Sequence, residues 1–131
     1  MSEFEFNNLK INHIGIIINS EDKNKFSEKF LYDPIQKVEV LFKFSQINNC
    51  FIEYITREGR AKNYELGFNH MCYNVENRKN LNKIHEYIIT NNLGIRLTLP
   101  EKSISLNCNY VTFYKLKFFN NIEFNIKDYS D

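Results

Sequence analysis

Alternating apolar and polar residues predict β-strands along most of the chain. Over residues 11–18, Ile14, Ile16 and Ile18 fall on one face of the alternation, and the other face carries His13. Residues 38–44 and 50–56 are rich in β-branched and aromatic residues, which is typical of strands. Four later segments have the same character and are also predicted as strands: 67–75, 95–99, 109–118 and 121–126.

Two segments carry the spacing of a helix. A helix of about three turns is predicted after the first strand, where Ser20 is a candidate N-cap and Phe26 and Phe30 stand four residues apart. A second helix is predicted over residues 78–92, and Gly94 follows it as a C-terminal stop. The apolar positions of this second helix fall on one face: Leu81, Ile84 and Ile88.

The predicted elements fall into two successive modules, about 10–57 and about 67–128. Polar residues without a period, 57–66, are predicted to link them. Each module begins with a strand, continues with a helix and ends with further strands. The first module is so short between its helix and its next strand that its second strand is expected to be vestigial or missing. A chain of 131 residues is expected to form a single domain, 1–131.

The two modules repeat residues as well as elements. "INHIGIIIN" over "FNHMCYNVE" aligns His13 with His70, and "FIEYI" over "NIEFN" aligns Glu53 with Glu123. A single strand histidine is most often a core residue, and a single strand glutamate often points to solvent. Four such residues at matching positions converge if the modules pack about a pseudo-twofold axis. A divalent cation would offset the repulsion between buried carboxylates, so the quartet predicts one divalent metal site.

These motifs, in this order, resemble the vicinal oxygen chelate superfamily over nearly the whole chain. That superfamily includes glyoxalase I, methylmalonyl-CoA epimerase, extradiol dioxygenases and bleomycin-resistance proteins, and the small glyoxalase and epimerase branch is the most similar. The resemblance implies an α+β fold, in which tandem βαβββ modules form a cup-shaped mixed sheet around the metal with helices outside. It assigns the metal ligands to His13, Glu53, His70 and Glu123. It also implies a homodimer.

The resemblance further implies a divalent-metal-dependent isomerase, epimerase or lyase. Such an enzyme acts through a metal-stabilised enolate on a small carbonyl or acyl-thioester substrate. Glu123 or Glu53 would move the proton. Glu39, in "KVEVLF", is a further candidate base by similarity to some epimerases, although a solvent-facing strand position explains it as well. The metal stays open among Ni, Co, Zn, Mn, Mg and Fe.

Three other functions remain open at this stage. A non-haem iron dioxygenase would use two histidines and one carboxylate, and Glu53 as a fourth ligand argues against it. A non-catalytic small-molecule binding or resistance protein often lacks the ligands, so the complete quartet argues against that function too. A pseudo-enzyme that keeps the ligands for another partner is excluded by no feature of the sequence.

Composition and charge narrow the partners and the compartment. The net charge of +1 provides no field that favours nucleic acid or anionic lipid. No segment approaches the roughly 20 apolar residues that cross a bilayer, and the first residues lack the apolar run of a signal peptide. Cys50, Cys72 and Cys108 form no CxxC pair, so free thiols in a reducing cytoplasm are expected.

Two aromatic residues and a third histidine complete the candidates. Phe113 and Tyr114 lie in a strand that faces the predicted cup. Either residue could line the substrate pocket, although ordinary core packing explains both. His85 is expected to be a partly exposed residue of the second helix.

Overall fold

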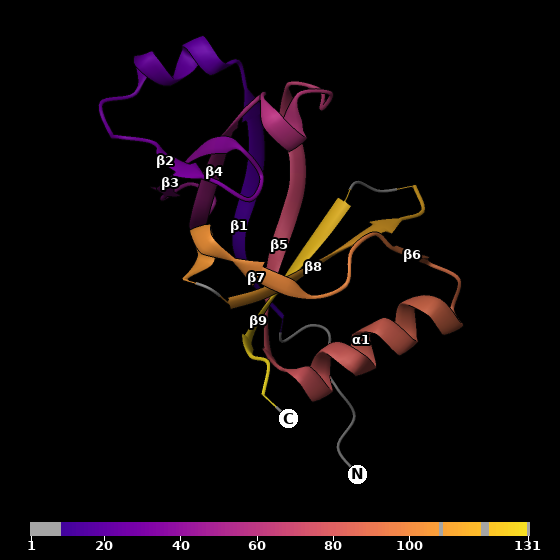
Figure 1. The fold of residues 1–131 in the computed structure, drawn as a ribbon. Helices are drawn as coiled ribbons and strands as arrows, with labels where there is room; N and C mark the ends of the chain where they lie inside the picture. Colours follow the sequence, from indigo (N-terminus) through magenta and orange to yellow (C-terminus); the bar gives the residue numbers. More distant parts are fainter. Residues whose placement is uncertain (1–8, 108, 119–120, 131) are drawn as a thin grey trace. The chain divides into compact units, whose positions relative to one another are not determined.

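The structure is a computed structural model that describes residues 9–107, 109–118 and 121–130. Within these residues the chain forms nine β-strands, one α-helix and three short 3-10 helices (Figure 1). The described chain divides into two compact units, His13–His70 and the remainder, 9–12 with 71–130. Parallel and antiparallel pairs both occur among the strands, so the predicted α+β class with a mixed sheet is confirmed. The division falls at His70, inside a strand.

The unit His13–His70 is built on four strands in the order β2-β3-β4-β1. Their bounds are Lys10–Ile18 for β1, Leu31–Asp33 for β2, Val38–Ser45 for β3 and Cys50–Thr56 for β4. β1 runs parallel to β4, and the other neighbours are antiparallel. The second strand of this module, expected to be vestigial or missing, is present with three residues.

One face of these four strands carries both a hydrophobic core and the polar site residues. The pairing of Glu53 with Gly15 on one side and with Phe42 on the other puts its side chain on the same face as His13. Further along this face lies the core of the unit, which includes Ala61 from a 3-10 helix, η3 (Gly59–Ala61). Its members are Ile17, Val38, Val40, Ile55 and Ala61. The strands that present the site are therefore anchored by apolar packing next to it.

The prediction of a three-turn helix after β1 is wrong in the type of helix and in its length. The segment forms a six-residue 3-10 helix, η2 (Ser20–Lys25), and no side chain caps its N-terminus. Phe26 and Phe30 do pack together, with ring centroids 5.4 Å apart, but Phe26 also packs on Tyr54 of β4 at 4.7 Å. Two aromatic residues form only a short apolar stripe, which is too little to stabilise an α-helix, and Phe26 packs on β4 instead.

The second unit contains the remaining strands and the α-helix. The strands run in the order β5-β9-β8-β6, and β7 also pairs with β8. Their bounds are Gly67–Asn77 for β5, Gly94–Arg96 for β6, Glu101–Ser103 for β7, Asn109–Leu116 for β8 and Asn121–Asp128 for β9. The strand predicted over 95–99 is thus shorter than expected, and β7 was not predicted. A further 3-10 helix, η4 (Ile104–Leu106), lies between β7 and β8.

The predicted second helix is confirmed as α1 (Arg78–Thr90). At its start the Asn77 side chain accepts a hydrogen bond from the Asn80 backbone N–H at 2.9 Å. Its end differs from expectation, because Asn92 and not Gly94 takes the left-handed conformation, with φ 52°. The backbone N–H groups of residues 92 and 93 then bond back to the last turn, as in a Schellman motif. No helix among the described residues is long and apolar enough to span a membrane.

Gly94 has a packing role in place of the predicted capping role. A Cβ atom at this position would lie 2.3 Å from the backbone oxygen of Lys115, which faces Ile95 across the β6–β8 pair. That distance is shorter than any real contact of a side chain, so only glycine lets β6 approach β8 this closely.

The core of this unit lies between α1 and the strands. It consists of Val75, Leu81, Ile84, Ile88, Tyr114, Ile122, Phe124 and Ile126. Tyr114 was a candidate for the substrate pocket or for the core. It is fully buried in the core. Its hydroxyl accepts a hydrogen bond from Arg96 Nε at 3.1 Å and donates to His85 Nδ1 at 2.6 Å. His85 is half-buried, as expected. Its Nδ1 atom, which would take up a proton, is occupied by the hydrogen bond from Tyr114.

We expect this contact to make the stability of the protein fall with acidification. Burial, and then the positive charge of Arg96, lower the pKa of His85 below its usual 6.5. The unfolded chain therefore takes up a proton on His85 at a higher pH than the folded chain does. The contribution of neutral His85 to the free energy of unfolding is complete above about pH 6.5, and it is lost as the pH falls from there toward the pKa of His85 in the folded protein. Urea unfolding between pH 8 and pH 5 measures this loss.

The His85→Gln variant tests the assignment to this residue. The difference in unfolding free energy between wild type and this variant should shrink as the pH falls. Glu86→Gln, which changes the exposed neighbour on the same helix, serves as the control and should follow wild type. A difference between wild type and His85→Gln that stays constant across this range would show that His85 does not carry the effect.

Candidate metal site

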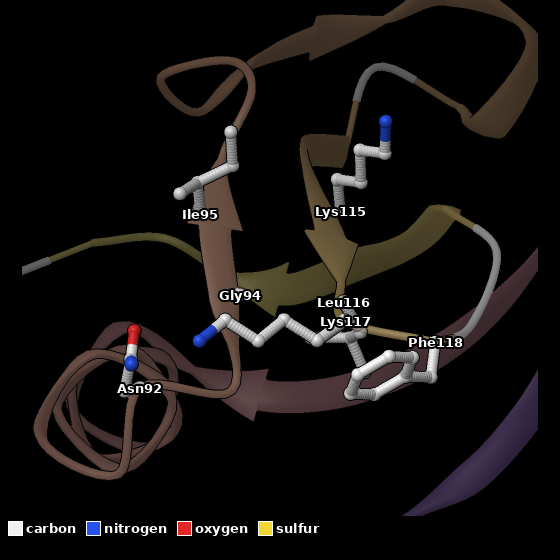
Figure 2. Close-up of a pocket in the computed structure, with 7 residues that line it drawn as sticks. All are labelled: Asn92, Gly94, Ile95, Lys115, Leu116, Lys117 and Phe118. Atoms are coloured by element: carbon white, nitrogen blue, oxygen red, sulfur yellow. The ribbon is translucent and has the colours of Figure 1, made fainter.

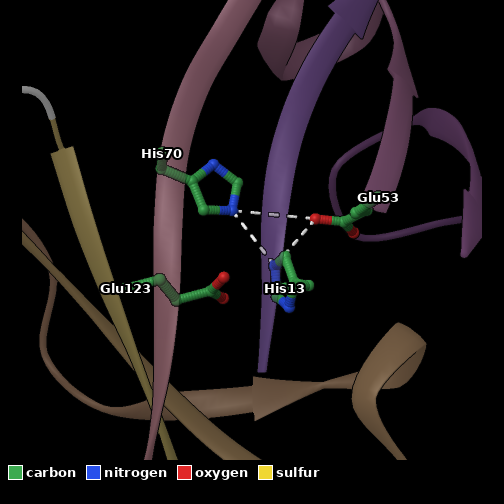
Figure 3. A group of neighbouring side chains, drawn as sticks. All are labelled: His13, Glu53, His70 and Glu123. Atoms are coloured by element: carbon green, nitrogen blue, oxygen red, sulfur yellow. Dashed lines mark hydrogen bonds and ion pairs between the residues drawn. The ribbon is translucent and has the colours of Figure 1, made fainter. Parts of the chain in front are cut away.

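Two histidines and a glutamate converge in the unit His13–His70. His13 comes from β1, Glu53 from β4 and His70 from β5, and their side chains point toward one another (Figure 3). The Nε2 atoms of the two histidines lie 3.2 Å apart. Glu53 Oε1 lies 3.2 Å from Nε2 of His13 and 3.7 Å from Nε2 of His70. All three residues are buried, so three polar atoms meet away from solvent.

The spacing of these three atoms fits a bound divalent ion. Metal–nitrogen and metal–oxygen bonds of roughly 2.0–2.2 Å place neighbouring ligand atoms about 3.0–3.6 Å apart. The observed separations of 3.2, 3.2 and 3.7 Å lie in or next to this range. Neutral imidazole and carboxylate together suit borderline metals such as Zn, Ni, Co and Fe. The cluster could therefore hold a metal ion.

A neighbouring asparagine orients the His70 ring for such a role. His70 Nδ1 donates a hydrogen bond to Asn69 Oδ1 at 2.7 Å. Because the amide oxygen only accepts, the proton of the neutral ring is held on Nδ1 and the lone pair stays on Nε2. That nitrogen is the one that faces His13 and Glu53. Bonds of this kind fix the tautomer of metal-binding histidines in general.

Two further residues fit closely around the imidazole rings. A Cβ atom on Gly15 would lie 2.2 Å from Cε1 of His70, so only a residue without a side chain leaves room for this ring. Phe42 of β3 packs edge-on to His13, with ring centroids 5.2 Å apart. Sequence reasoning noted Gly15 and Asn69 within the repeated motifs but assigned them no role. A glycine in a strand two residues from a candidate ligand is itself a signal of close approach.

Glu123 is positioned by β9 in the other unit. It pairs with Phe113 of β8, and its neighbours Ile122 and Phe124 belong to the core under α1. Strand alternation therefore directs Glu123 to the face away from the helix, where it is nonetheless only 5% exposed. Phe113 shares that face and is half-buried. Membership of Glu123 in the ligand set remains a prediction from the sequence repeat.

Glu39 lies apart from the three converging residues. Its neighbours on β3, Val38 and Val40, belong to the core face, so Glu39 points to the opposite face of the strands. There its carboxylate forms an ion pair with Lys23 of η2. The structure thus brings His13, Glu53 and His70 together but does not bring Glu39 to them.

Comparison with known proteins supports the fold. No family model matches the sequence, and no curated protein has a significantly similar sequence. A hypothetical protein from Bacillus halodurans C-125 has a similar structure at 20% identity and a TM-score of 0.62, covering 95% of this chain and 98% of that one. The methylmalonyl-CoA epimerase of Mycobacterium tuberculosis is similar at 11% identity and a TM-score of 0.64, covering 92% of this chain and 88% of the epimerase.

A third similar structure contains a ligand. It is a Streptomyces coelicolor methylmalonyl-CoA epimerase variant in complex with 2-nitronate-propionyl-CoA, at 13% identity and a TM-score of 0.59, with 88% of this chain and 95% of that chain covered. At these identities the likeness concerns the fold. The chain therefore has the fold of methylmalonyl-CoA epimerase, one of the enzymes that the sequence resemblance names.

We expect a side chain at position 15 to disrupt the cluster. In Gly15→Ala the new methyl group would overlap the His70 ring and push Nε2 out of position. Affinity for a divalent ion should fall roughly tenfold or more while the chain remains folded. Isothermal titration with Zn²⁺ or Co²⁺ and a circular dichroism spectrum measure the two properties. Ile16→Val, on the opposite face of β1, is the control, and equal affinities in all three proteins would contradict the role of Gly15.

We expect Asn69 to tune the affinity through the His70 tautomer. Asn69→Leu removes the acceptor for Nδ1–H, so the proton can move to Nε2 and block the ligand position. The loss in metal affinity should be about 10–100-fold, as for other partners of ligating histidines. Asn69→Asp keeps an acceptor and should retain most of the affinity. Loss of affinity in Asn69→Asp to the same extent would show that the hydrogen bond is not the cause.

Proposed function

We propose that this protein is a divalent-metal-dependent isomerase, epimerase or lyase that acts on a small carbonyl or acyl-thioester substrate. The observation that carries the proposal is the buried convergence of His13, His70 and Glu53 at separations that fit one ion. The fold of methylmalonyl-CoA epimerase gives independent support. The acyl-CoA analogue bound by the Streptomyces coelicolor variant makes acyl thioesters the first substrates to test.

We assign the fourth ligand position to Glu123. It aligns with Glu53 in the sequence repeat, just as His70 aligns with His13. Glu123 is buried, and its strand turns it away from the apolar core under α1. Two neutral imidazoles and two carboxylates would balance the charge of one divalent ion. Such a neutral site costs less to bury than the carboxylates alone.

The chemistry of the proposal is proton transfer beside a carbonyl group. A bound divalent cation would supply charge stabilisation for the enolate that forms when the neighbouring C–H bond loses its proton. Glu53 and Glu123 are the candidate bases, because both carboxylates are buried. Burial excludes water. A carboxylate without water around it is a stronger base, and a proton that it accepts does not exchange with solvent. Glu39 is a weaker candidate because Lys23 neutralises it on the opposite face.

A non-haem iron dioxygenase is the second candidate, and one observation favours it. Within the unit His13–His70 the converging residues are two histidines and one carboxylate, which is the ligand set of many non-haem iron oxygenases. The two candidates differ in the part they give to Glu123. An oxygenase with three ligands binds its metal without this residue.

We expect purified protein to bind about one divalent ion per chain through all four residues. Glu123→Gln and Glu53→Gln should each weaken binding of Co²⁺ by at least roughly tenfold, because each removes a charged ligand. Glu39→Gln is the matched control, since it removes a strand carboxylate from the other face, and its affinity should equal that of wild type. Metal analysis and isothermal titration measure stoichiometry and affinity.

Two results would redirect the proposal. Unchanged affinity in Glu123→Gln, combined with loss in Glu53→Gln, would favour the three-ligand dioxygenase. Failure of the wild-type protein to bind any divalent ion would remove the enolate chemistry, and a non-catalytic binding protein would replace it.

A homodimer and a cytoplasmic location complete the proposal. The homodimer follows from the sequence resemblance alone. The location is supported by Cys50 and Cys72, which are both buried as free thiols. Burial raises the pKa of the Cys50 thiol, so this cysteine stays protonated and unreactive. Cys108 lies outside the described residues.

A further inference from the structure

The face of the second unit that carries Glu123 also carries a lysine. Lys115 of β8 is opposite Asn121 of β9, and two residues earlier Phe113 is opposite Glu123. Residues opposite each other, and residues two apart on one strand, share a face of a sheet. Lys115, Phe113 and Glu123 therefore point to the same side of these strands, away from the core under α1.

The lysine stands within reach of whatever binds at Glu123. Residues on neighbouring strands that are offset by two positions have side-chain origins roughly 7–8 Å apart. The flexible four-carbon stem of lysine lets its ammonium group cover much of that distance. A group bound a few bonds away from a substrate atom at Glu123 would therefore meet the ammonium group of Lys115.

Two lysines on this face, Lys115 and Lys127, differ in their ion pairs, and the ammonium group of Lys115 can contact a ligand. Lys127, on the same face of β9 but four residues beyond Glu123, forms an ion pair with Glu76 at 3.6 Å. Among the described residues, no hydrogen bond or ion pair is found for the ammonium group of Lys115, which is exposed. The charge of Lys115 is thus not neutralised by the protein as that of Lys127 is.

A pocket of about 660 Å³ adjoins this lysine at the β6–β8 edge. It is lined by Asn92, Gly94, Ile95, Lys115, Leu116, Lys117 and Phe118. Figure 2 shows Ile95 and Lys115 rising on the same side of their two strands, as the register between them requires. Lys117 lies in the same pocket, but its side chain runs toward Asn92 (Figure 2). The pocket thus offers a cation beside an apolar wall.

We propose that Lys115 binds an anionic group of the substrate, a carboxylate or a phosphate, that is displaced by a few bonds from the reacting carbonyl. Phe113, which is opposite Glu123 and two residues from Lys115, lies beside the chain that joins the two groups, and Ile95 flanks the anionic group on the other side of Lys115. Lys115 is then a specificity-determining residue that selects anionic carbonyl or thioester compounds over neutral ones. This inference rests on the proposed function, because Glu123 marks the reacting end.

Nitronates of small nitroalkanes test the inference, since a nitronate has the shape and charge of an enolate. The probes are the nitronates of 1-nitropropane, 3-nitropropionate and 2-nitroethylphosphonate, whose chains end in a methyl, a carboxylate and a phosphonate group. Each is titrated calorimetrically into Co²⁺-loaded wild-type protein. At least one of the two probes with a charged end group should bind roughly tenfold more tightly than the nitronate of 1-nitropropane, whose end group is uncharged, as a charge-assisted hydrogen bond provides. The charged end group that gives the tighter binding identifies the source of the charge.

Matched variants assign the preference to one lysine. Lys115→Gln should lose the preference for the charged end group and keep the affinity for the nitronate of 1-nitropropane. Lys115→Arg should keep the preference. Lys127→Gln removes the same charge from the same face of β9, but outside the pocket and at a lysine already paired with Glu76, and should behave as wild type.

The outcomes separate this inference from the proposed function. If the nitronate of 1-nitropropane binds and Lys115→Gln leaves the preference for a charged end group unchanged, the role of Lys115 is overturned and the proposed function stands. Equal losses of the preference in Lys115→Gln and Lys127→Gln would also overturn it, because they would indicate the overall positive potential of this face and not a contact with Lys115. If Co²⁺ binds but no nitronate binds any variant, the enolate chemistry fails and the role of Lys115 fails with it.

Discussion

The meeting of two imidazole nitrogens and one carboxylate oxygen away from water is the constraint on which the rest of this structure depends. Such groups are costly to bury unless they are paired or coordinate an ion. The neighbourhood of His13 and His70 is arranged to hold them at this spacing. Gly15 leaves space for one ring, Phe42 packs against the other, and Asn69 holds the tautomer. Each of these contacts lowers the freedom of a ligand atom and adds no new ligand.

The two compact units solve the same packing problem with different elements. In the second unit, α1 covers one face of the strands and leaves the other to Glu123, Phe113 and Lys115. In the unit His13–His70 the corresponding segment is only a short 3-10 helix, and its core lies on the face that carries the site. The polar residues there are held by strand pairing and adjacent apolar packing, which gives rigid positions for chemistry.

Much of the fold was visible in residue patterns, for a local reason. Strand alternation around His13 and the apolar stripe of α1 depend on neighbours in sequence, and both were predicted correctly. The helix after β1 was predicted wrongly, because Phe26 packs on a strand residue more than twenty positions away. The three-residue strand β7 was missed because so short and polar a segment has no strand pattern of its own, and only its pairing with β8 defines it.

The candidate site also has features that the sequence predicts and features that only the tertiary structure sets. The sequence alone supplied the identity and order of the candidate ligands, because His13 and His70, like Glu53 and Glu123, occupy equivalent places in a repeat. Folding decided the distances between ligand atoms, since strands far apart in sequence set them. Folding also separated Glu39 from Glu53. Both glutamates lie in apolar strand segments, so their sequence surroundings are similar. The alternation of side chains along the strands places them on opposite faces, and Glu39 pairs with Lys23 on its own face.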